Sequence, residues 1–411
     1  MFKRVTGTKD ILAGEVSAWQ RIEETARNTF HLYNYKEIRL PLIEEAALFN
    51  RSLGEETEVV KKQMFLIQRE HDTFALRPEA TASVARAYIE NNLDKTEGFT
   101  KFYYIGPMFR AERPQKGRLR QFHHIGCEAI GSAQAELDAE IISLADKLLK
   151  NFSVSDYKIR INSLGCPEDK KRFAQILKKK LEEKTDKLCQ DCQVRFNANI
   201  LRILDCKNNA CKEIVNKLDI GQAHLCSDCA EHFKKVTTGL DLLGVEYTID
   251  DHLVRGLDYY TRTVFEISHQ GLGAQDAIGA GGRYDDLVKD LGGPQSPAVG
   301  FAFGVERLLL VASPQSSVAS QNLVYIIPLG NEAKQESIVL LNELRSQGIC
   351  ADTDYLAKSL KGAMRQADSL GVKYVIIIGD NELKNKAVTL KNMSTGEQKE
   401  IKRESLIKEL C

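Results

Sequence analysis

The sequence has no excess of charge of either sign. Lys and Arg together number 57, and Asp and Glu also number 57, so the formal net charge at pH 7 is zero. A chain without net charge has no long-range field that draws it to nucleic acid or to a membrane surface. Any nucleic-acid partner must therefore meet local basic patches, because phosphate contacts need Lys and Arg.

Long apolar runs are also lacking. None approaches the roughly 18 residues that a membrane span needs, and residues 1–15, MFKRVTGTKDILAGE, contain no apolar core of the signal-peptide type. These absences predict a cytoplasmic protein with no membrane partner. A length of 411 residues predicts about two to three domains, at roughly 150 residues each.

Cysteine is plentiful by comparison, with ten residues and no secretion signal. That combination is typical of a reducing compartment, where thiols stay free or bind metal. Six of the ten lie between residues 189 and 229. The simplest prediction is one four-thiolate zinc site built from the two C-x-x-C pairs, Cys189, Cys192, Cys226 and Cys229. Cys206 and Cys211 would then be spare or belong to an alternative set, and the competing interpretation is a group of free thiols.

Hydrophobic periodicity predicts helices and strands up to residue 312. The predicted strands are 36–41, 64–68, 73–79, 101–110, 120–131 and 157–163, and the predicted helices include 15–33, 79–92 and a buried one over 298–312. The polar, basic stretch 111–119 is expected to join two strands as a long hairpin. Residues 166–235 are rich in Lys and Cys and interrupt the strand-rich pattern, so they are predicted to be an inserted domain.

A short polar stretch, SPQSSVASQ at 313–321, predicts a linker before the last part of the chain. Beyond it the predicted strands are 323–328, 349–353 and 373–378, with helices at 332–347 and 358–370, then two weaker strands and a final helix. Such alternation predicts a small α/β domain with a mainly parallel sheet. Because this part carries few candidate catalytic residues, we interpret it as a binding module.

The predicted hairpin carries the first candidate site. Arg110 and Glu112 end one strand, and Arg118 and Phe122 flank the start of the next. Arginines on strands grip phosphate oxygens through charge-assisted bonds, and an aromatic face stacks on a purine. A charged hairpin that faces water would give the same pattern. Arg307 lies in an otherwise apolar segment and needs an anionic partner, which a triphosphate or a structural carboxylate would supply.

The stretch LVRGLDYYTRTVFE at 253–266, together with GAGGRYDDLV at 279–288, is the most informative part of the sequence. Strand alternation would put Tyr260 and Arg262 on one face. An arginine such as Arg255 at the mouth of a strand, beside a tyrosine hydroxyl, suits a small anionic or zwitterionic ligand. Glycines let the backbone run close to a bound molecule, although a tight turn between two strands is the alternative.

Together these motifs resemble those of the histidyl-tRNA synthetases, a family of class II aminoacyl-tRNA synthetases. The hairpin 109–122 is similar to the second signature motif of the class, GFAFGVER to the third, and the stretch around Pro41 to the weaker first. LVRGLDYYTRTVFE and AIGAGGRYDDLV resemble two histidine-specific motifs that other members of the class lack. The resemblance runs over nearly the whole chain.

That resemblance implies an α+β architecture in three parts. The class II catalytic domain, an antiparallel sheet with flanking helices, would span 1–321 and be interrupted by the Cys-rich insertion at 166–235. A C-terminal α/β anticodon-binding domain would span 322–411.

The implied reaction has two steps. The carboxylate of histidine attacks the α-phosphate of ATP to give histidyl-adenylate and pyrophosphate, and the 3′ end of tRNA(His) then accepts the histidyl group. Arg110 and Arg255 would be the catalytic pair at the α-phosphate, and Mg²⁺ would accompany ATP. By the same resemblance, ATP would be bound by Arg110, Glu112, Arg118, Phe122 and Arg307.

The resemblance also implies a histidine pocket. Glu79 and Thr81 in RPEAT would accept from the substrate ammonium, and Glu128, Tyr260 and Tyr284 would surround the imidazole. An imidazole needs one donor and one acceptor, and a carboxylate together with a phenol supplies both.

One pocket position departs from the family pattern. His124 stands where the family typically has Gln after QFH, close to the expected place of the substrate ammonium. A neutral imidazole accepts a hydrogen bond, whereas a protonated one repels the ammonium. We therefore expect function to be retained but to weaken more steeply with acid than in a relative with Gln. The alternative is that His124 turns away and bonds to the backbone.

The implied partners are ATP, histidine, tRNA(His) and a second copy of the chain, in a homodimer joined through the N-terminal helix and the Pro41 region.

The main alternative is a non-catalytic paralogue, either a regulatory subunit of histidine biosynthesis or a tRNA-sensing module. The regulatory kind typically loses the C-terminal domain and degrades the histidine-specific motifs. Here both are kept, with Arg255 and Tyr260 in place.

Overall fold

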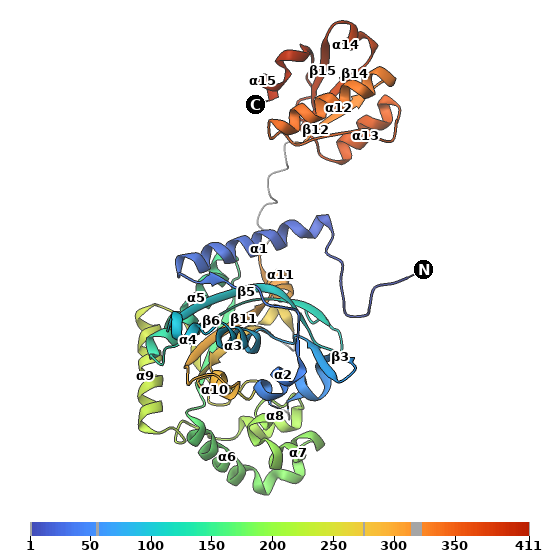
Figure 1. Cartoon of the computed structure of the whole chain (residues 1–411). Coiled ribbons are helices and arrows are strands. Elements are labelled where there is room, and N and C mark those ends of the chain that lie inside the picture. The colour runs from blue at the N-terminus through green and yellow to red at the C-terminus, as the bar shows by residue number, and fades with distance from the viewer. Residues whose placement is uncertain (1, 55–56, 274–275, 314–322, 411) are drawn as a thin grey trace. The chain divides into compact units, whose positions relative to one another are not determined.

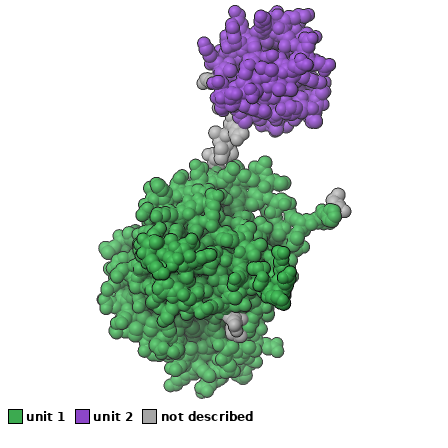
Figure 2. Space-filling model, viewed as in Figure 1, with its two compact units in different colours: residues 1–313 green, residues 314–411 purple. Residues whose placement is uncertain are grey.

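The computed structural model describes residues 2–54, 57–273, 276–313 and 323–410. The chain divides into two compact units, residues 1–313 and 314–411 (Figures 1 and 2). Each unit has hydrophobic clusters of its own. The predicted domain boundary between residues 321 and 322, and the predicted linker after residue 313, lie outside the described residues.

The larger unit is built on an eight-stranded sheet with the order β1-β5-β6-β11-β10-β9-β7-β8 (Figure 1). The bounds are Lys36–Glu37 (β1), Thr100–Phe109 (β5), Gln121–Ile130 (β6), Ala298–Gly304 (β11), Ala277–Arg283 (β10), Thr261–His269 (β9), Tyr157–Ser163 (β7) and Thr248–Ile249 (β8). From β5 to β7 every neighbouring pair is antiparallel. The two edge strands pair in parallel. The predicted antiparallel sheet is therefore confirmed.

Helices cover both faces of this sheet, because successive strand residues point to opposite sides. On β5, Tyr103 packs in one hydrophobic cluster and Tyr104 in the other, and Val264 and Phe265 divide in the same way on β9. One cluster takes residues from α1 (Ala13–Leu32), α5 (Ala135–Asn151), α9 (Ser227–Leu242) and α11 (Val305–Val311). The other takes residues from α2 (Ala46–Leu53), α3 (Thr81–Glu90) and α10 (Leu287–Asp290).

A second, three-stranded antiparallel sheet has the order β2-β4-β3, with bounds Ile43–Glu45, Asp72–Leu76 and Phe65–Arg69. The predicted strand pair at 64–68 and 73–79 is thus confirmed. Arg77 ties this sheet to the large one, since its guanidinium donates to the carbonyl oxygens of Pro107 and Leu40, at 3.0 Å each.

The chain between β7 and α9 is helical. It comprises α6 (Pro167–Leu181), η2 (Glu182–Lys187), α7 (Gln190–Ala198), η3 (Ile200–Ile203) and α8 (Asn209–Asn216). Its buried residues, among them Leu177 and Ile203, belong to the same hydrophobic cluster as Tyr259 and Tyr260. The insertion therefore packs on residues 253–266, the segment that contains Arg255 and both tyrosines.

The smaller unit is a five-stranded sheet with the order β13-β12-β14-β15-β16. Its strands are Val324–Pro328 (β12), Ala351–Thr353 (β13), Tyr374–Ile378 (β14), Ala387–Asn392 (β15) and Gln398–Lys402 (β16), and its helices are Asn331–Ser346 (α12), Leu360–Ser369 (α13), Asp380–Lys384 (α14) and Leu406–Leu410 (α15). β13, β12 and β14 are parallel, and β15 and β16 are antiparallel. The predicted α/β alternation is confirmed.

Two local predictions are wrong. Residues 298–312 are not one buried helix, because the first seven form β11 and only Val305–Val311 is helical. β11 lies between two strands and is buried on both sides, so it has no alternation to distinguish it from a buried helix. The prediction that Tyr260 and Arg262 lie on one face of a strand is also wrong, since β9 begins at Thr261 and Arg262 has a φ of 45°.

Among the described helices, none is long and apolar enough to cross a membrane.

Candidate active site

The larger unit contains a cavity of about 1450 Å³. Every residue that the sequence assigned to histidine, to ATP or to catalysis lines it: Glu79, Thr81, Arg110, Glu112, Arg118, Phe122, His124, Glu128, Arg255, Tyr260, Tyr284 and Arg307. They come from segments far apart in the sequence, which the strand order β5-β6-β11-β10-β9 brings side by side. The structure thus brings the candidate residues together, while the role of each stays a prediction.

Glu128, on β6, is the centre of a buried hydrogen-bond network. One carboxylate oxygen accepts from the hydroxyls of Thr81 at 2.7 Å and Tyr104 at 3.1 Å, and the other accepts from Tyr284. Burial raises the pKa of Glu128 to about 8, although the hydrogen bonds from Tyr284 and Thr81 act to lower it. The network fixes an oxygen-rich wall that can exchange a proton near neutral pH.

Glu79 lies just before α3 and accepts from the first backbone N–H groups of that helix, Thr81 at 2.6 Å and Ala82 at 2.9 Å. Its side chain is buried, and burial raises its pKa against the effect of these two bonds. A carboxylate held by two N–H donors keeps lone pairs for a further donor. Glu79 is therefore a rigid acceptor at one side of the cavity.

His124 is half-buried in the cavity wall, and its Nδ1 atom is buried. Burial and the positive charge of Arg110 and then Arg77 lower its pKa to about 3. Its ring packs edge-on against Phe122, with centroids 5.1 Å apart, and among the described residues its Nδ1 has no hydrogen-bond partner. A pKa lowered to about 3 argues against the expected acid sensitivity, because a neutral imidazole does not repel the ammonium. The structure equally opposes the alternative that the ring bonds to the backbone through Nδ1.

Arg255 is held in place by Glu266 of β9, with which it forms an ion pair. Glu266 also pairs with Arg160, so one carboxylate organises two arginines. The Nε of Arg255 is buried and, within the described part of the chain, lacks a hydrogen-bond partner. An unpaired buried guanidinium N–H is costly unless an oxygen of a ligand satisfies it.

The hairpin between β5 and β6 presents the other arginines. Arg110 donates from Nε to the carbonyl oxygen of Pro78 at 2.9 Å, and its guanidinium lies 5.4 Å from the centroid of the Phe122 ring. Arg118 and Glu112 form an ion pair at 3.0 Å. The side chains therefore stay on the cavity side of the hairpin rather than spreading into water.

Arg307, in α11, reaches the same hairpin. Its Nε donates to the carbonyl oxygen of Gly117 at 3.3 Å, and its Nη1 donates to that of Ala277. Burial and the nearby charge of Arg118 lower its pKa. Two arginines that repel each other across a cavity form a site for an anion.

Glycine at 300 is required where β11 passes beneath Glu128. A Cβ atom there would lie 1.8 Å from Glu128 Oε2 and 2.4 Å from the carbonyl oxygen of Cys127. The missing side chain therefore leaves the room that the buried carboxylate occupies.

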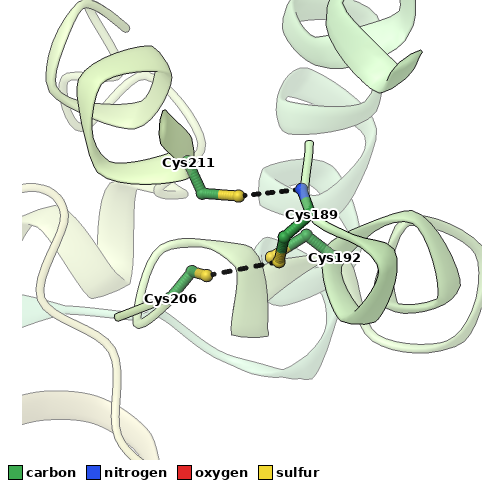
Figure 3. A group of neighbouring side chains, drawn as sticks. All are labelled: Cys189, Cys192, Cys206 and Cys211. Atoms are coloured by element: carbon green, nitrogen blue, oxygen red, sulfur yellow. Dashed lines mark hydrogen bonds between the residues drawn. The ribbon is translucent and has the colours of Figure 1, made fainter. Parts of the chain in front are cut away.

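The predicted zinc ligand set is wrong in its combination of cysteines. Four cysteines gather in one group, Cys189, Cys192, Cys206 and Cys211 (Figure 3), and a second group contains Cys166, Asp169, Cys226 and Cys229. The two C-x-x-C pairs thus belong to different groups, because each pair begins a different helix, α7 and α9. Spacing along the chain could not show which segments between them fold back.

A family model of histidyl-tRNA synthetase matches residues 7–308, and a model of the anticodon-binding domain matches residues 323–411. The chain belongs to the histidyl-tRNA synthetase family. Its relatives include the histidine–tRNA ligase of Halothermothrix orenii, which is 47% identical over 412 residues, covering 99% of this chain and 98% of the relative. That of Geobacter sulfurreducens is 44% identical, over 98% of this chain and 97% of the relative.

Solved structures agree with this membership. The apo histidyl-tRNA synthetase of S. aureus matches with a TM-score of 0.82 and 36% identity, covering 100% of both chains. A protein of Bacillus halodurans C, described as an ATP phosphoribosyltransferase regulatory subunit/histidyl-tRNA synthetase, matches with a TM-score of 0.67 at 23% identity. At that identity the second likeness shows the fold alone.

Within this histidyl-tRNA synthetase framework, sequence reasoning missed several residues that organise the cavity. Glu266, Tyr104 and Tyr259 line it, and Arg202 reaches its edge from the insertion. Glu266 could have been found from the sequence, because it is the one acidic residue in the otherwise largely apolar segment TVFEIS that follows Arg255. Arg202 gave no such signal, because its partner lies more than fifty residues away along the chain.

Proposed function

We propose that this chain is a histidine–tRNA ligase, which forms histidyl-adenylate and pyrophosphate from histidine and ATP and then transfers the histidyl group to the 3′ end of tRNA(His). The observation that carries the proposal is the gathering of all twelve candidate residues around one cavity. Support comes from relatives named histidine–tRNA ligase that are 44 to 47% identical over almost the full length.

In the first step, negative charge grows on the α-phosphoryl oxygens while the histidine carboxylate attacks. Arg110 and Arg255 supply fixed positive charge there, so catalysis consists of positioning and electrostatic stabilisation. Glu266 and the Pro78 carbonyl hold these arginines before the substrate arrives. Their orientation then costs little at the moment of reaction.

ATP would lie along the hairpin and α11. Phe122 offers a ring face and Glu112 a carboxylate for the adenine, while Arg118 and Arg307 take the outer phosphates. Mg²⁺ would enter with ATP and neutralise the pyrophosphate, and the cavity offers carboxylates that suit this ion, such as Asp276.

Histidine would bind on the Glu128 side of the cavity. Glu79 and Thr81 face the ammonium, and Glu128, Tyr260 and Tyr284 meet the imidazole nitrogens. A pocket built from buried polar groups rejects amino acids that leave those groups unpaired. The neutral His124 offers its free Nδ1 as an additional acceptor.

The second step needs tRNA, for which the smaller unit is the proposed anticodon-binding domain. We also propose that the chain works in the cytoplasm as a homodimer. Apolar side chains remain exposed on the small sheet beyond Pro41, with Ile43 51% and Leu66 57% exposed. A second copy would cover them, because exposed apolar surface of this kind marks protein contacts.

The test is charging of tRNA(His) with labelled histidine by the purified chain. Charging with histidine, and not with other amino acids or other tRNAs, is the expected result. A folded chain that binds tRNA(His) but charges nothing would favour the non-catalytic paralogue. Light scattering of the same sample gives the mass of the assembly, and a monomer would contradict the dimer.

A further inference from the structure

Four cysteines of the insertion form a compact group, here named the thiol cluster: Cys189, Cys192, Cys206 and Cys211 (Figure 3). The cluster joins three segments. Cys189 and Cys192 begin α7, Cys206 follows η3, and Cys211 lies in α8. All four sulfur atoms lie within 4.8 Å of one another, and three of the four residues are buried.

The spacing of the sulfur atoms fits a shared ion. Zinc–sulfur bonds of about 2.3 Å in a tetrahedron place the sulfurs about 3.8 Å apart. Cys189 Sγ and Cys206 Sγ are 3.8 Å apart. A disulfide would need about 2.05 Å, and all four are free cysteines. The cluster therefore has the dimensions of a metal site.

Backbone donors point at the sulfurs. The N–H of Cys189 donates to Cys211 Sγ at 3.2 Å, and the N–H of Asn208 donates to Cys206 Sγ at 3.4 Å. Such donors stabilise thiolate ligands and fix their orientation. These two N–H groups are therefore a second feature, independent of the sulfur spacing, that favours the thiolate form of the cysteines.

The other group, around Asp169, differs in that its carboxylate is already engaged. One oxygen accepts from the Cys166 N–H at 3.3 Å, and the other accepts from the Cys226 N–H at 3.1 Å and pairs with Arg172. Cys166 and Cys226 are the residues that precede α6 and α9. Asp169 thus caps two helices, and this group serves as a control.

We propose that the thiol cluster binds one Zn²⁺ per chain through four thiolates, and that the ion positions the loop between Arg255 and Tyr260. Four soft sulfur ligands in a tetrahedron select zinc among the common intracellular divalent ions. The second part of the proposal rests on the proposed ligase function, whereas the binding of zinc does not.

The segment between the cluster's second and third ligands reaches the catalytic loop. Arg202 donates to the carbonyl oxygen of Gly256 at 2.5 Å, and Asn199 donates to Asp258 Oδ1 at 3.2 Å. Arg202 Nε also lies 3.6 Å from that Asp258 oxygen. Gly256 and Asp258 lie in the chain between Arg255 and Tyr260, so the insertion touches the loop directly.

The zinc ion has a mechanical role in this arrangement. Between Cys192 and Cys206 the chain has the rest of α7 and one turn of 3-10 helix, and Ile203 packs it into the same hydrophobic cluster as Tyr259. Ligands at both ends close it, and metal binding then supplies folding free energy. Arg202 and Asn199 are positioning residues, since they act on Arg255 and Tyr260 through the loop backbone.

The binding of zinc is tested by the metal content of the purified full chain. We expect one zinc per chain in the wild type and in Cys226→Ser, and a loss of most of it in Cys206→Ser and Cys211→Ser. Where a serine variant fails to fold, the wild type is stripped with a chelator and titrated with Co²⁺. The visible absorption of tetrahedral cobalt thiolate is then expected at one equivalent. Zinc retained in both cluster variants, or a cobalt spectrum without thiolate character, would overturn the site.

The positioning role is tested with Arg202→Met, which leaves the four ligands intact. Zinc content should stay at one per chain, while kcat for histidine-dependent pyrophosphate exchange falls at least tenfold with a smaller change in KM for ATP. Hydrogen exchange should quicken at residues 256–260 both in this variant and in the zinc-free wild type. Unchanged exchange at 256–260 after removal of zinc would contradict the coupling.

Zinc content and hydrogen exchange are read without substrate, so they remain informative if the ligase proposal fails. In that case no amino acid supports pyrophosphate exchange in the wild type, although zinc still follows the cysteines of the cluster.

Discussion

Glu128 is protonated over much of the neutral range, since its pKa is about 8. A neutral carboxyl among the hydroxyls of Thr81, Tyr104 and Tyr284 both donates and accepts. Burial of the ionised form costs free energy, which the unfolded chain does not incur because there the carboxyl is in water. The folded and unfolded states therefore bind different numbers of protons.

The first prediction follows for Glu128→Gln. Because the folded pKa is raised, this group's contribution to stability is fully present below the unfolded pKa of about 4.5 and is lost as pH rises toward 8. The loss should approach about 1.4 kcal/mol per pH unit in that window. The variant lacks it, so its stability relative to the wild type should improve as pH rises from 5 to 8. Denaturant unfolding at several pH values measures this, and parallel curves would contradict the raised pKa.

The second prediction concerns His124. Its pKa of about 3 keeps it neutral wherever the protein is assayed, so His124→Gln should leave the shape of the pH profile for histidine binding unchanged between pH 5.5 and 8. Both side chains offer an acceptor, and affinity should change by less than about tenfold, or about 1.4 kcal/mol. Calorimetric titration with histidine checks the profile. A profile that loses an acid limb in the variant would show that His124 titrates near its ordinary pKa.

Motifs and the family resemblance selected Arg110, Arg255 and Glu128, and the structure brings all three to one cavity, while their roles stay predictions. Their surroundings could not be predicted, because the pKa of His124 depends on burial and on the charges of Arg110 and of Arg77, which directly follows β4 of the smaller sheet. The choice among six cysteines failed for the same reason, since it depends on how α7 and α8 fold together.

At the scale of elements, β11 joins the two halves of the cavity floor by pairing with β6 and β10. The sequence indicated most strands correctly because they alternate or end in turns. It misassigned residues 298–304, a continuous apolar run that is compatible with either a strand or a helix. The glycines in that run were the signal for a strand, since close packing of β11 on Glu128 excludes a side chain.

The third prediction tests that packing. Gly300→Ala should destabilise the chain by about 1 to 3 kcal/mol, as overpacking in a core does, and should weaken histidine binding by displacing Glu128. Gly304→Ala on the same strand is the control, because its Cβ would meet Arg307 at an ordinary 3.5 Å. Thermal unfolding and histidine titration of both variants measure the difference. Equal stability and equal histidine affinity of the two variants would show that the close contact between position 300 and Glu128 does not matter.

For the whole molecule, the proposed active site belongs to one of the two units alone. All cavity residues belong to the larger unit, and the smaller unit has separate hydrophobic clusters. The change of pattern after residue 312 made this division predictable, since an α/β alternation follows a region of antiparallel strands.

The fourth prediction concerns a chain that ends at Ser313. It should keep histidine-dependent pyrophosphate exchange within about tenfold of the full chain, because the proposed adenylate site is complete without the smaller unit. Charging of tRNA(His) should fall much further, since anticodon contacts are lost. The two activities are compared on the same preparation. Equal loss of both would mean that the smaller unit is needed for the adenylate site itself.

The most direct test of the proposed ligase function is histidine-dependent exchange of pyrophosphate into ATP by the full chain, with Arg255→Ala beside it. We expect exchange with histidine alone among the amino acids, and a fall of at least a hundredfold in the variant, which corresponds to about 2.7 kcal/mol of lost transition-state stabilisation. Absence of exchange with any amino acid in folded wild-type protein, or full exchange in Arg255→Ala, would contradict the proposal.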